Sequence, residues 1–340
     1  MPHYGILLYP SANRVYTDTA PALLRAELAV FGEALSRPPE GIEERVLGGV
    51  PYVTFSTADR LSGQDIALLS NLSSLYALYE LTGDLLRPVE IAPLEVFDSD
   101  LLTIQKYAGK TNELFTKLLL NVTLLSTSDP TGFLHRPLHV LDPLCGRGTT
   151  LNQAMSYGLD ATGFDVDGRD FEAYERFIKT WLRSKRIKHT ADAGQLRRNK
   201  VKLGRRLELE FGLSKEQYKA GLVRRVAYYN CDTLAGAALL KAGSVDAIVT
   251  DAPYGVQHGS HRADELSRSP RDLLAEAVPA WIRTLRSGGA LGLSWNTHVA
   301  TRDEVAAILT GAGLEVRETG DFTHRVDQAI LRDLMVARKP

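Results

Sequence analysis

The chain has 340 residues, of which 44% are hydrophobic and 24% charged, with 40 basic against 41 acidic side chains. This composition excludes a collagen-like, low-complexity or disordered chain, and its two cysteines, Cys145 and Cys231, exclude a disulfide scaffold. The start carries no basic leader, and no apolar run approaches the roughly 20 residues of a bilayer span, so we expect a cytoplasmic protein without membrane contact.

The first hundred residues mix short apolar segments typical of strands, 4–9 and 51–55, with segments typical of helices, 20–34 and 65–81. They contain no repeat and no known motif. We therefore expect a small α+β domain over residues 1–100, with RNA binding as one candidate role. Residues 101–126 then predict an amphipathic helix that leads into the second half of the chain.

From residue 139 onward, apolar strand-like segments alternate with helical ones. This alternation predicts a mostly parallel sheet with helices on both faces, in a domain that covers residues 101–340. In such sheets, ligands bind beyond the carboxyl ends of the strands. Each of the polar motifs described next follows a predicted strand.

The first motif, DPLCGRGTT at 142–150, lies between a strand and a helix. Its glycines let the backbone approach a ligand closely, and the start of the helix offers unpaired N–H groups. The motif is neither a P-loop nor the dinucleotide fingerprint, because it lacks both glycine patterns. Its acid, Asp142, disfavours phosphate and favours a cationic ligand such as an ammonium or sulfonium. A glycine turn with a purely structural role is the alternative.

The next two strands also end in carboxylates. Asp165 comes about 20 residues after the glycine turn, where nucleotide-binding sheets place an acid on the ribose hydroxyls. Asp232, in the sequence NCD at 230–232, can accept a hydrogen bond from an adenine amine. Each acid alone is equally well a solvent-facing loop residue, but their occurrence at successive strand ends favours one nucleoside-binding site.

The sequence DAPYG at 251–255 follows the next predicted strand. The Asp251 carboxylate and a backbone carbonyl supply two acceptors for an NH2 group, and Tyr254 offers a ring on which a base can stack. Accepting both hydrogens of an amine turns the lone pair of its nitrogen toward an electrophile. A tight Pro-Tyr-Gly turn is the structural alternative.

Basic residues are concentrated in one segment, because residues 183–206 contain ten Lys or Arg against one acid, Asp192. About 65 residues separate the strand ends at Asp165 and Asn230, against roughly 30 for a whole βαβ unit. We predict a basic insertion at about 183–222 that binds nucleic-acid phosphates, with a solvated helix face as the alternative. The predicted phosphate-binding residues are Arg183, Lys185, Arg186, Arg197, Arg198, Lys200, Lys202, Arg205 and Arg206. The histidines of the loop after DAPYG, His258 and His261, are typical of a surface loop, and we assign no metal.

Together these motifs resemble the class I S-adenosylmethionine-dependent methyltransferases that act on amines, and among them the tRNA guanine-N2 methyltransferase group. Residues 142–149 match that group's Asp-Pro-x-Cys-Gly-x-Gly-Thr turn, and residues 107–111 are similar to the segment before it. Residues 163–165 match its Gly-x-Asp, 230–232 its Asn-x-Asp and 251–255 its Asp-Pro-Pro-Tyr-Gly, with Ala252 in place of the first proline. The resemblance covers about 107–340 and implies a Rossmann-like α/β fold with a seven-stranded, mostly parallel sheet beside the smaller N-terminal domain.

The resemblance also implies roles for the matched residues. Asp251, Pro253 and Tyr254 would hold the target amine. The residues that would bind S-adenosyl-L-methionine are Asp142, Cys145, Gly146, Gly148, Thr149, Asp165, Cys231 and Asp232. The implied reaction is methylation of an exocyclic amine of a base in RNA, foremost guanine N2 of tRNA. The open alternatives are a DNA adenine or cytosine amino-methyltransferase, a protein-glutamine methyltransferase and, because of Ala252, an inactive subunit that binds the cofactor and RNA.

Overall fold

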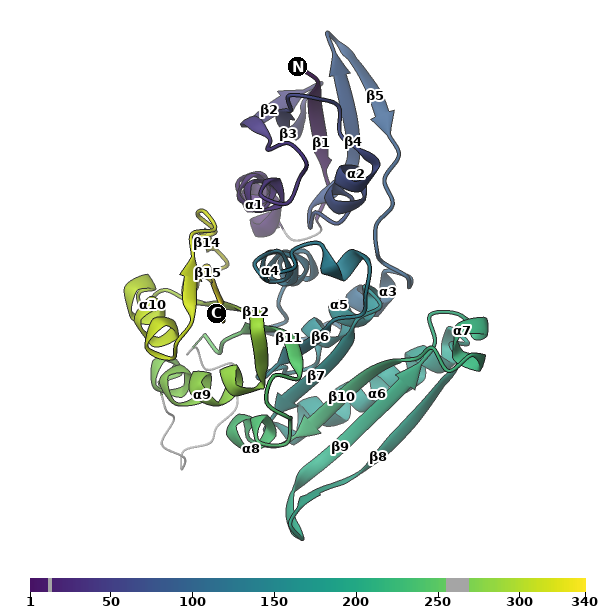
Figure 1. Ribbon diagram of the computed structural model, residues 1–340, viewed down its shortest axis with the longest axis vertical. Helices are drawn as coiled ribbons and strands as arrows, with labels where there is room; N and C mark the ends of the chain where they lie inside the picture. Colours follow the sequence, from purple (N-terminus) through teal and green to yellow (C-terminus); the bar gives the residue numbers. More distant parts are fainter. Residues whose placement is uncertain (12–13, 255–268) are drawn as a thin grey trace.

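The computed structural model describes residues 1–11, 14–254 and 269–340, which form two β-sheets with their helices (Figure 1). The N-terminal sheet has five strands in the order β2-β3-β1-β4-β5, and every neighbouring pair is antiparallel. Its elements are β1 (His3–Leu8), α1 (Arg14–Gly32), β2 (Glu40–Leu47), β3 (Val50–Ser56), α2 (Gly63–Leu69), β4 (Leu75–Thr82) and β5 (Leu85–Val89).

One of the predicted helices is wrong over half of its length. Residues 65–81 were expected to be helical throughout, but helix α2 ends at Leu69 and β4 follows. The side chains of Ser70 and Asn71 donate hydrogen bonds back to the carbonyls of Ile66 and Ala67, which closes the helix. Strand β4 then pairs with β1 on one side and β5 on the other, so sheet contacts outweigh the local helical pattern.

The second sheet has ten strands in the order β13-β15-β12-β11-β6-β7-β10-β9-β8, with β14 beside β15. Strands β6, β7, β10, β11 and β12 are mutually parallel, and β15 is antiparallel to β12. Its strands are β6 (His139–Asp142), β7 (Asp160–Asp165), β8 (His189–Arg198), β9 (Val201–Phe211), β10 (Arg224–Asn230), β11 (Val245–Asp251), β12 (Leu285–Asn296), β13 (Glu315–Arg317), β14 (His324–Arg325) and β15 (Leu331–Arg338).

Helices cover both faces of this sheet, because neighbouring residues of a strand enter different cores. Val140 of β6 is buried with residues of α5 and α6, whereas Leu141 is buried with residues of α8, α9 and α10. The helices are α3 (Asp100–Thr103), α4 (Glu113–Leu125), α5 (Thr149–Ser156), α6 (Gly168–Ser184), α7 (Lys215–Lys219), α8 (Thr233–Ala237), α9 (Pro270–Thr284) and α10 (Arg302–Gly311), with a 3-10 turn at Gly132–Leu134. The predicted Rossmann-like α/β fold is thus confirmed, but the sheet has ten strands rather than seven and is parallel only in its centre, because β8, β9 and β14 add antiparallel pairs. Within the described residues, no helix has the length and apolar content to span a membrane.

The basic insertion is a β-hairpin rather than a helix. Strands β8 and β9 pair with each other, and β9 pairs antiparallel with β10, which extends the sheet (Figure 1). The two residues of the turn, Asn199 and Lys200, have φ of 50° and 68°, the left-handed conformation of a tight hairpin turn. The helical alternative for this segment is therefore wrong. The hairpin had no clear sequence signal, because Asn-Lys makes its turn without the glycine that usually marks such turns.

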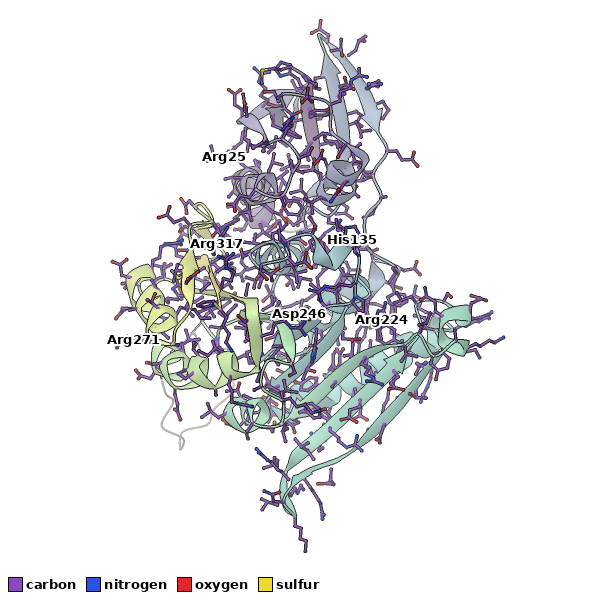
Figure 2. All side chains as sticks on the ribbon, in the orientation of Figure 1. Arg25, His135, Arg224, Asp246, Arg271 and Arg317 are labelled. Atoms are coloured by element: carbon purple, nitrogen blue, oxygen red, sulfur yellow. The ribbon has the colours of Figure 1, made fainter. Side chains whose placement is uncertain are left out.

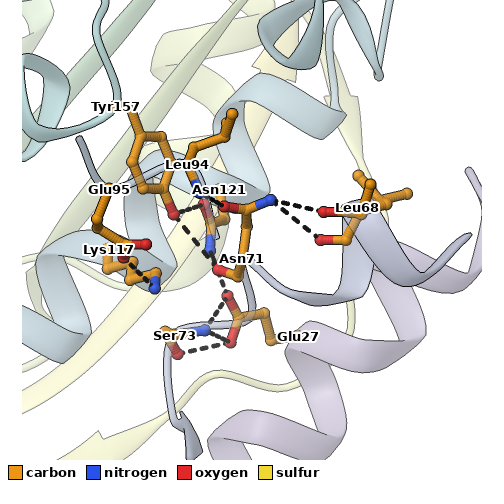
Figure 3. Close-up of polar contacts among 10 residues, drawn as sticks. Glu27, Leu68, Asn71, Ser73, Leu94, Glu95, Lys117, Asn121 and Tyr157 are labelled. Atoms are coloured by element: carbon orange, nitrogen blue, oxygen red, sulfur yellow. Dashed lines mark hydrogen bonds and ion pairs between the residues drawn. The ribbon is translucent and has the colours of Figure 1, made fainter. Parts of the chain in front are cut away.

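Buried polar side chains join the two sheets (Figure 3). Glu27 of α1 accepts hydrogen bonds from the Ser73 backbone and from Asn121 Nδ2 of α4, at 3.0 and 2.8 Å. The Tyr157 hydroxyl, just after α5, donates to Asn121 Oδ1 at 2.9 Å. Burial raises the pKa of Glu27. At the surface of the same junction, Arg317 binds Glu33 at 2.8 Å (Figure 2).

Candidate active site

The strand order reverses between β6 and β11, because the chain continues from β6 to β7 on one side and from β11 to β12 on the other. Ligands in open α/β sheets bind at this switch point, beyond the carboxyl ends of the strands. A cavity of about 820 Å³ lies there, within the range of about 300–1,000 Å³ that ligand sites occupy. The predicted site residues that line it are Asp142, Cys145, Gly146, Thr149, Asp165, Asp251, Pro253 and Tyr254.

The glycine turn after β6 forms one end of this cavity. Gly148 has φ of 76°, and a Cβ at this position would stand 2.4 Å from the ring of Tyr174. Gly146 has φ of 48°, and its carbonyl accepts a hydrogen bond from the Tyr228 hydroxyl at 2.6 Å. Gly148 is therefore required by both backbone conformation and space, although it does not itself line the cavity.

Asp142, at the end of β6, is buried against this turn. Its Oδ1 accepts hydrogen bonds from the Leu144 backbone at 3.1 Å and from the Thr250 hydroxyl at 2.9 Å. Burial is the largest cause that raises the pKa of Asp142, to about 7. Its charge state therefore responds to a cation that binds beside it.

Asp165, at the end of β7, holds the same turn from the other side. One carboxylate oxygen accepts from the Gly146 backbone at 2.9 Å and the other from the Asp167 backbone at 2.8 Å. Burial raises the pKa of Asp165. Asp142, Asp165, Asp170 and Asp251 all line the cavity, and Arg147 is the one Lys or Arg among the described lining residues. This balance suits a cationic ligand.

The segment before α4 covers the turn. The Tyr107 hydroxyl lies 3.0 Å from Thr149 Oγ1, and the Arg147 guanidinium stacks 4.6 Å from the centre of the Tyr107 ring. Arg147 also donates to Asp170 at 2.7 Å. This segment separates α3 from α4, and the amphipathic helix predicted within 101–126 is confirmed as α4, Glu113–Leu125.

Asp251, at the end of β11, lines the opposite end of the cavity and is surrounded there by three hydroxyl groups. Its Oδ2 accepts hydrogen bonds from the Thr111 hydroxyl at 2.6 Å and the Tyr254 hydroxyl at 2.5 Å. Its Oδ1 accepts from the Ser294 hydroxyl of β12. Burial and the Asp251 charge raise the pKa of Tyr254 well above its usual value. This hydroxyl therefore stays protonated and donates a hydrogen bond to Asp251. Gly255 and the loop 256–268 lie outside the described residues.

Ala252, which stands where the resembling group has proline, has a structural role. Its backbone N–H donates to the Ser294 carbonyl at 2.8 Å, which continues the pairing of β11 with β12. Proline has no N–H and cannot make this bond. The bond also ties Asp251 to Ser294, whose hydroxyl is one of its donors.

Two predicted cofactor residues lie away from the cavity lining. Cys231 is buried in the core on the α8 side, and burial raises its pKa to about 12. Asp232 is exposed and caps α8, since its Oδ1 accepts from the backbones of Leu234 and Ala235. Its predicted contact with an adenine amine stays a prediction.

The structure divides the nine predicted phosphate-binding residues into two groups. Lys185 binds Asp98 and Asp100, Arg205 binds Glu172, and Arg206 binds Asp192 and Glu208. These three cations are thus neutralised by the protein. The other six are exposed and form no ion pair with a described residue: Arg183, Arg186, Arg197, Arg198, Lys200 and Lys202.

Four of those six form the tip of the β8–β9 hairpin, which we call the finger (residues 196–204). The last residue of β10, Asn230, pairs with Arg205 of β9, so the finger continues past the carboxyl edge of the sheet. Four residues at about 3.4 Å each give a reach of about 14 Å. Four strand spacings separate β9 from β11, which places the finger about 19 Å to the side of Asp251.

Sequence reasoning missed several side chains of the site: Tyr107, Thr111, Arg147, Thr250, Ser294 and Arg332. Arg147 lies within the glycine motif at 142–150 but in a position that the motif leaves open, and Tyr107 and Thr111 lie in the segment 107–111; the other three are single residues outside any motif. Thr111 alone has a local signal. The next residue, Asn112, is of a type that begins helices, and its side chain caps α4 by accepting hydrogen bonds from two backbone N–H groups, which places Thr111 just before a helix start.

No protein-family model and no curated protein matches the chain. Among solved structures, a geranyl diphosphate methyltransferase in complex with SAM is 13% identical over 67% of this chain and 85% of that one, with a TM-score of 0.38. Precorrin-6y C5,15-methyltransferase from Geobacter metallireducens is 12% identical over 73% and 98%, with a TM-score of 0.41. A SAM-dependent methyltransferase from Methanosarcina mazei is 16% identical over 61% and 95%, with a TM-score of 0.37. Likenesses of this size carry no argument about the function of this chain.

Proposed function

We propose that this chain is an S-adenosyl-L-methionine-dependent methyltransferase that acts on the exocyclic amine of a nucleic-acid base, with guanine N2 of tRNA as the first candidate. The observation that supports it most is one cavity with two ends. The glycine turn with Asp142 and Asp165 forms one end, and Asp251 with Pro253 and Tyr254 forms the other.

The residues at the first end fit this cofactor. Gly146 lines the cavity and has no Cβ, so a ligand can approach the backbone of the turn closely there. The first N–H groups of α5 point from the helix start, where a carboxylate is favoured, while Asp142 suits the ammonium beside it. Asp165 is placed for the ribose hydroxyls, and Asp142, Cys145, Gly146, Thr149 and Asp165 would hold the group. The bound cofactor would supply a methyl group already activated on a sulfonium.

At the second end, Asp251 would accept hydrogen bonds from the target amine and turn its lone pair toward the methyl group. The new N–CH3 bond forms as the S–CH3 bond breaks, and the nitrogen loses one proton to Asp251 or to water. Holding donor and acceptor in line is sufficient for much of the acceleration, because the methyl group is already activated. Tyr254 would stack on the base once it has left its helix.

The finger supports a nucleic acid as the substrate. Its four exposed cations, Arg197, Arg198, Lys200 and Lys202, stand past the same edge of the sheet as the cavity. They lie about 19 Å to the side of Asp251 and up to about 14 Å past the sheet edge, roughly 24 Å along the diagonal, where they can contact phosphates of the strand that carries the target base, or of its complement. Phosphate contacts of this kind give affinity that falls with salt and little choice of sequence.

Transfer of a radiolabelled methyl group to unmodified tRNA tests the proposal. We expect labelled tRNA with the wild-type protein and none with Asp251→Ala, which keeps the cofactor end intact. Nucleoside analysis of the product distinguishes guanine N2 from other amines. Transfer to DNA or to a protein glutamine, with none to RNA, would reject RNA as the substrate.

The inactive-subunit alternative has its own test at Ala252. Because the Ala252 N–H bonds to Ser294, Ala252→Pro would remove a bond of about 0.5–1.5 kcal/mol and disturb a donor to Asp251. We expect this change to lower stability in urea and to lower transfer. Cofactor binding without transfer to any nucleic acid, in the wild type and in Ala252→Pro alike, would favour the inactive subunit.

A further inference from the structure

Arg332 of β15 lies beside Asp251 and is buried without adequate partners. Its side chain is 4% exposed, and its buried Nε forms no hydrogen bond with any residue that the structure describes. Its Nη2 stands 3.8 Å from Asp251 Oδ2, which is longer than a hydrogen bond. Its other contacts are the rings of Phe115, at 4.3 Å, and Tyr254, at 5.1 Å.

A structural role does not account for this arrangement. Burying an ion costs several kcal/mol unless it is paired and hydrogen-bonded, whereas each ring contributes about 0.5–2 kcal/mol. The neighbour across the strand pair, His324, is not a counter-ion for Arg332, because burial lowers its pKa to about 4 and its protonated form would be a second cation. A buried donor without a partner calls for an explanation, and a bound polar group is one.

Tyr254 lines the cavity, whereas Arg332 is not among its lining residues and contacts the Tyr254 ring, 5.1 Å from the ring centre. In the described state the Tyr254 hydroxyl occupies Asp251 Oδ2, the oxygen that also faces Arg332. An amine that binds Asp251 has to displace this hydroxyl, since Thr111 and Ser294 already hold Asp251 from other sides. The ring moves with its hydroxyl, and the guanidinium is then open to the base.

We propose that Arg332 is a substrate-binding residue whose guanidinium donates a hydrogen bond to the ring nitrogen next to the amine held by Asp251. This inference rests on the proposed function and extends it. Guanine presents N3 beside its N2 amine, adenine presents N1 beside N6, and cytosine presents N3 beside N4. Asp251 and Arg332 together therefore form an acceptor and a donor that match one edge of a base.

Calorimetric titration of guanosine and 3-deazaguanosine tests this role, because the deaza base has a C–H in place of N3. The protein is saturated with S-adenosylhomocysteine, and no transfer is needed. We expect the wild type to bind guanosine about 10- to 100-fold more tightly than the deaza base, the range for a hydrogen bond from a charged group. This comparison requires no variant and is independent of folding defects.

Variants of Arg332 then test whether this residue is the source of the preference for guanosine over 3-deazaguanosine. Arg332→Met should bind both nucleosides equally and weakly, and Arg332→Lys, which keeps one charged donor, should recover part of the preference. Arg286→Met is the matched control, because Arg286 also has a buried, unpartnered Nε but binds Asp246 at the opposite edge of the sheet (Figure 2). It should behave as the wild type.

Three results would overturn the inference: equal binding of the two nucleosides by the wild type, an unchanged preference in Arg332→Met, or no binding of guanosine at all. Methyl transfer to tRNA together with any of them would refute the role of Arg332 and leave the proposed function standing. Absence of both transfer and guanosine binding would refute both.

Discussion

The two ends of the cavity are built in different ways. At the cofactor end, Asp142 and Asp165 are held largely by backbone N–H groups of neighbouring turn residues, Leu144, Gly146 and Asp167. At the amine end, Asp251 is held by side chains from distant segments, Thr111 before α4 and Ser294 in β12. The first end is formed mainly by residues 142–167, with one hydrogen bond from the distant Thr250, whereas the second depends on side chains from three separate segments. Changes at the two ends should therefore separate binding from transfer.

The largest expected effect is at Asp251. Asp251→Asn keeps the shape and removes the charged acceptor, so transfer should fall by about 10²- to 10⁴-fold, the range for a lost general base. Calorimetry should show nearly unchanged binding of S-adenosylhomocysteine, because the cofactor end is held separately. Equal losses of binding and transfer would contradict this separation of the two ends.

The finger adds a third region, whose effect should appear only in nucleic-acid affinity. Changing Arg197, Arg198, Lys200 and Lys202 to Gln removes up to four phosphate contacts. The slope of log affinity against log salt should then fall by up to about 3.6 for a duplex, with up to about 10³-fold weaker binding near 0.1 M salt. Filter binding across a salt series measures both.

A matched control for the finger lies at the opposite edge of the sheet. Lys215, Lys219 and Lys241 are exposed and lie away from the carboxyl ends of the strands. Changing these three to Gln should leave the salt slope unchanged. A slope equally reduced in both variants would mean that net charge rather than the finger holds the nucleic acid.

A smaller effect is expected from a pair of changes within the glycine turn. Gly148→Ala places a Cβ 2.4 Å from Tyr174, whereas Gly146→Ala meets nothing within 4 Å. Both incur about 1–2 kcal/mol for a left-handed backbone, and Gly148→Ala adds about 1–3 kcal/mol of overpacking. Urea unfolding should rank the two accordingly, and Gly148→Ala should lose more affinity for S-adenosylhomocysteine. Equal unfolding midpoints would show that Tyr174 moves aside freely.

The smallest effect is a pH dependence at Asp142. Because the pKa of Asp142 is raised to about 7, the carboxyl is neutral below that pH in the unliganded protein. A bound ammonium favours the ionised form, so affinity for S-adenosylhomocysteine should increase from about pH 6 to about pH 8. Stability of the unliganded protein should fall as pH rises from the usual aspartate pKa to about 7, because only the folded state holds the proton there.

Asp142→Asn should flatten most of the affinity curve and part of the stability curve. What remains belongs to Asp165 and, for stability, also to Glu27, since burial raises the pKa of both. Calorimetry and urea unfolding at several pH values measure the two slopes. An affinity that falls with pH in the wild type would place the positive end of the cofactor elsewhere.

The same contrast explains what the sequence could predict. The acids at the strand ends and the glycine turn were recognised because each lies within a few residues of its own signal, a strand end or a left-handed turn. Asp142, Asp165 and Asp251 accordingly line one cavity as expected. Asp232 also has a strand-end signal, but it ends a strand farther from the switch point and caps a helix.

The missed features depend on contacts between distant segments. Arg332 lies 81 positions after Asp251 in an ordinary strand pattern, and nothing local marks its proximity to that carboxylate. The finger was recognised as basic but not as a hairpin, since Lys200 occupies a turn position where glycine is the usual signal. Residues 75–82 look helical alone and become a strand only between β1 and β5.

The helices that begin at the cavity both end at the junction of the two sheets. Helix α4 (Glu113–Leu125) begins just after Thr111, which binds Asp251, and carries Asn121 in its third turn, whereas α5 (Thr149–Ser156) begins at the glycine turn and is followed by Tyr157. The buried hydrogen bonds around Glu27 thus attach the N-terminal sheet to α4, and through Asn121 and Tyr157 to α5, the two helices that begin at the cavity. Such an attachment holds the N-terminal sheet at a fixed distance from the cavity. A long substrate that contacts both the sheet and the cavity would therefore be selected by its length. Cutting the chain at residue 100 would strip Asn121 of its Glu27 partner and uncover apolar surface, which makes the remainder a poor candidate for an independent enzyme.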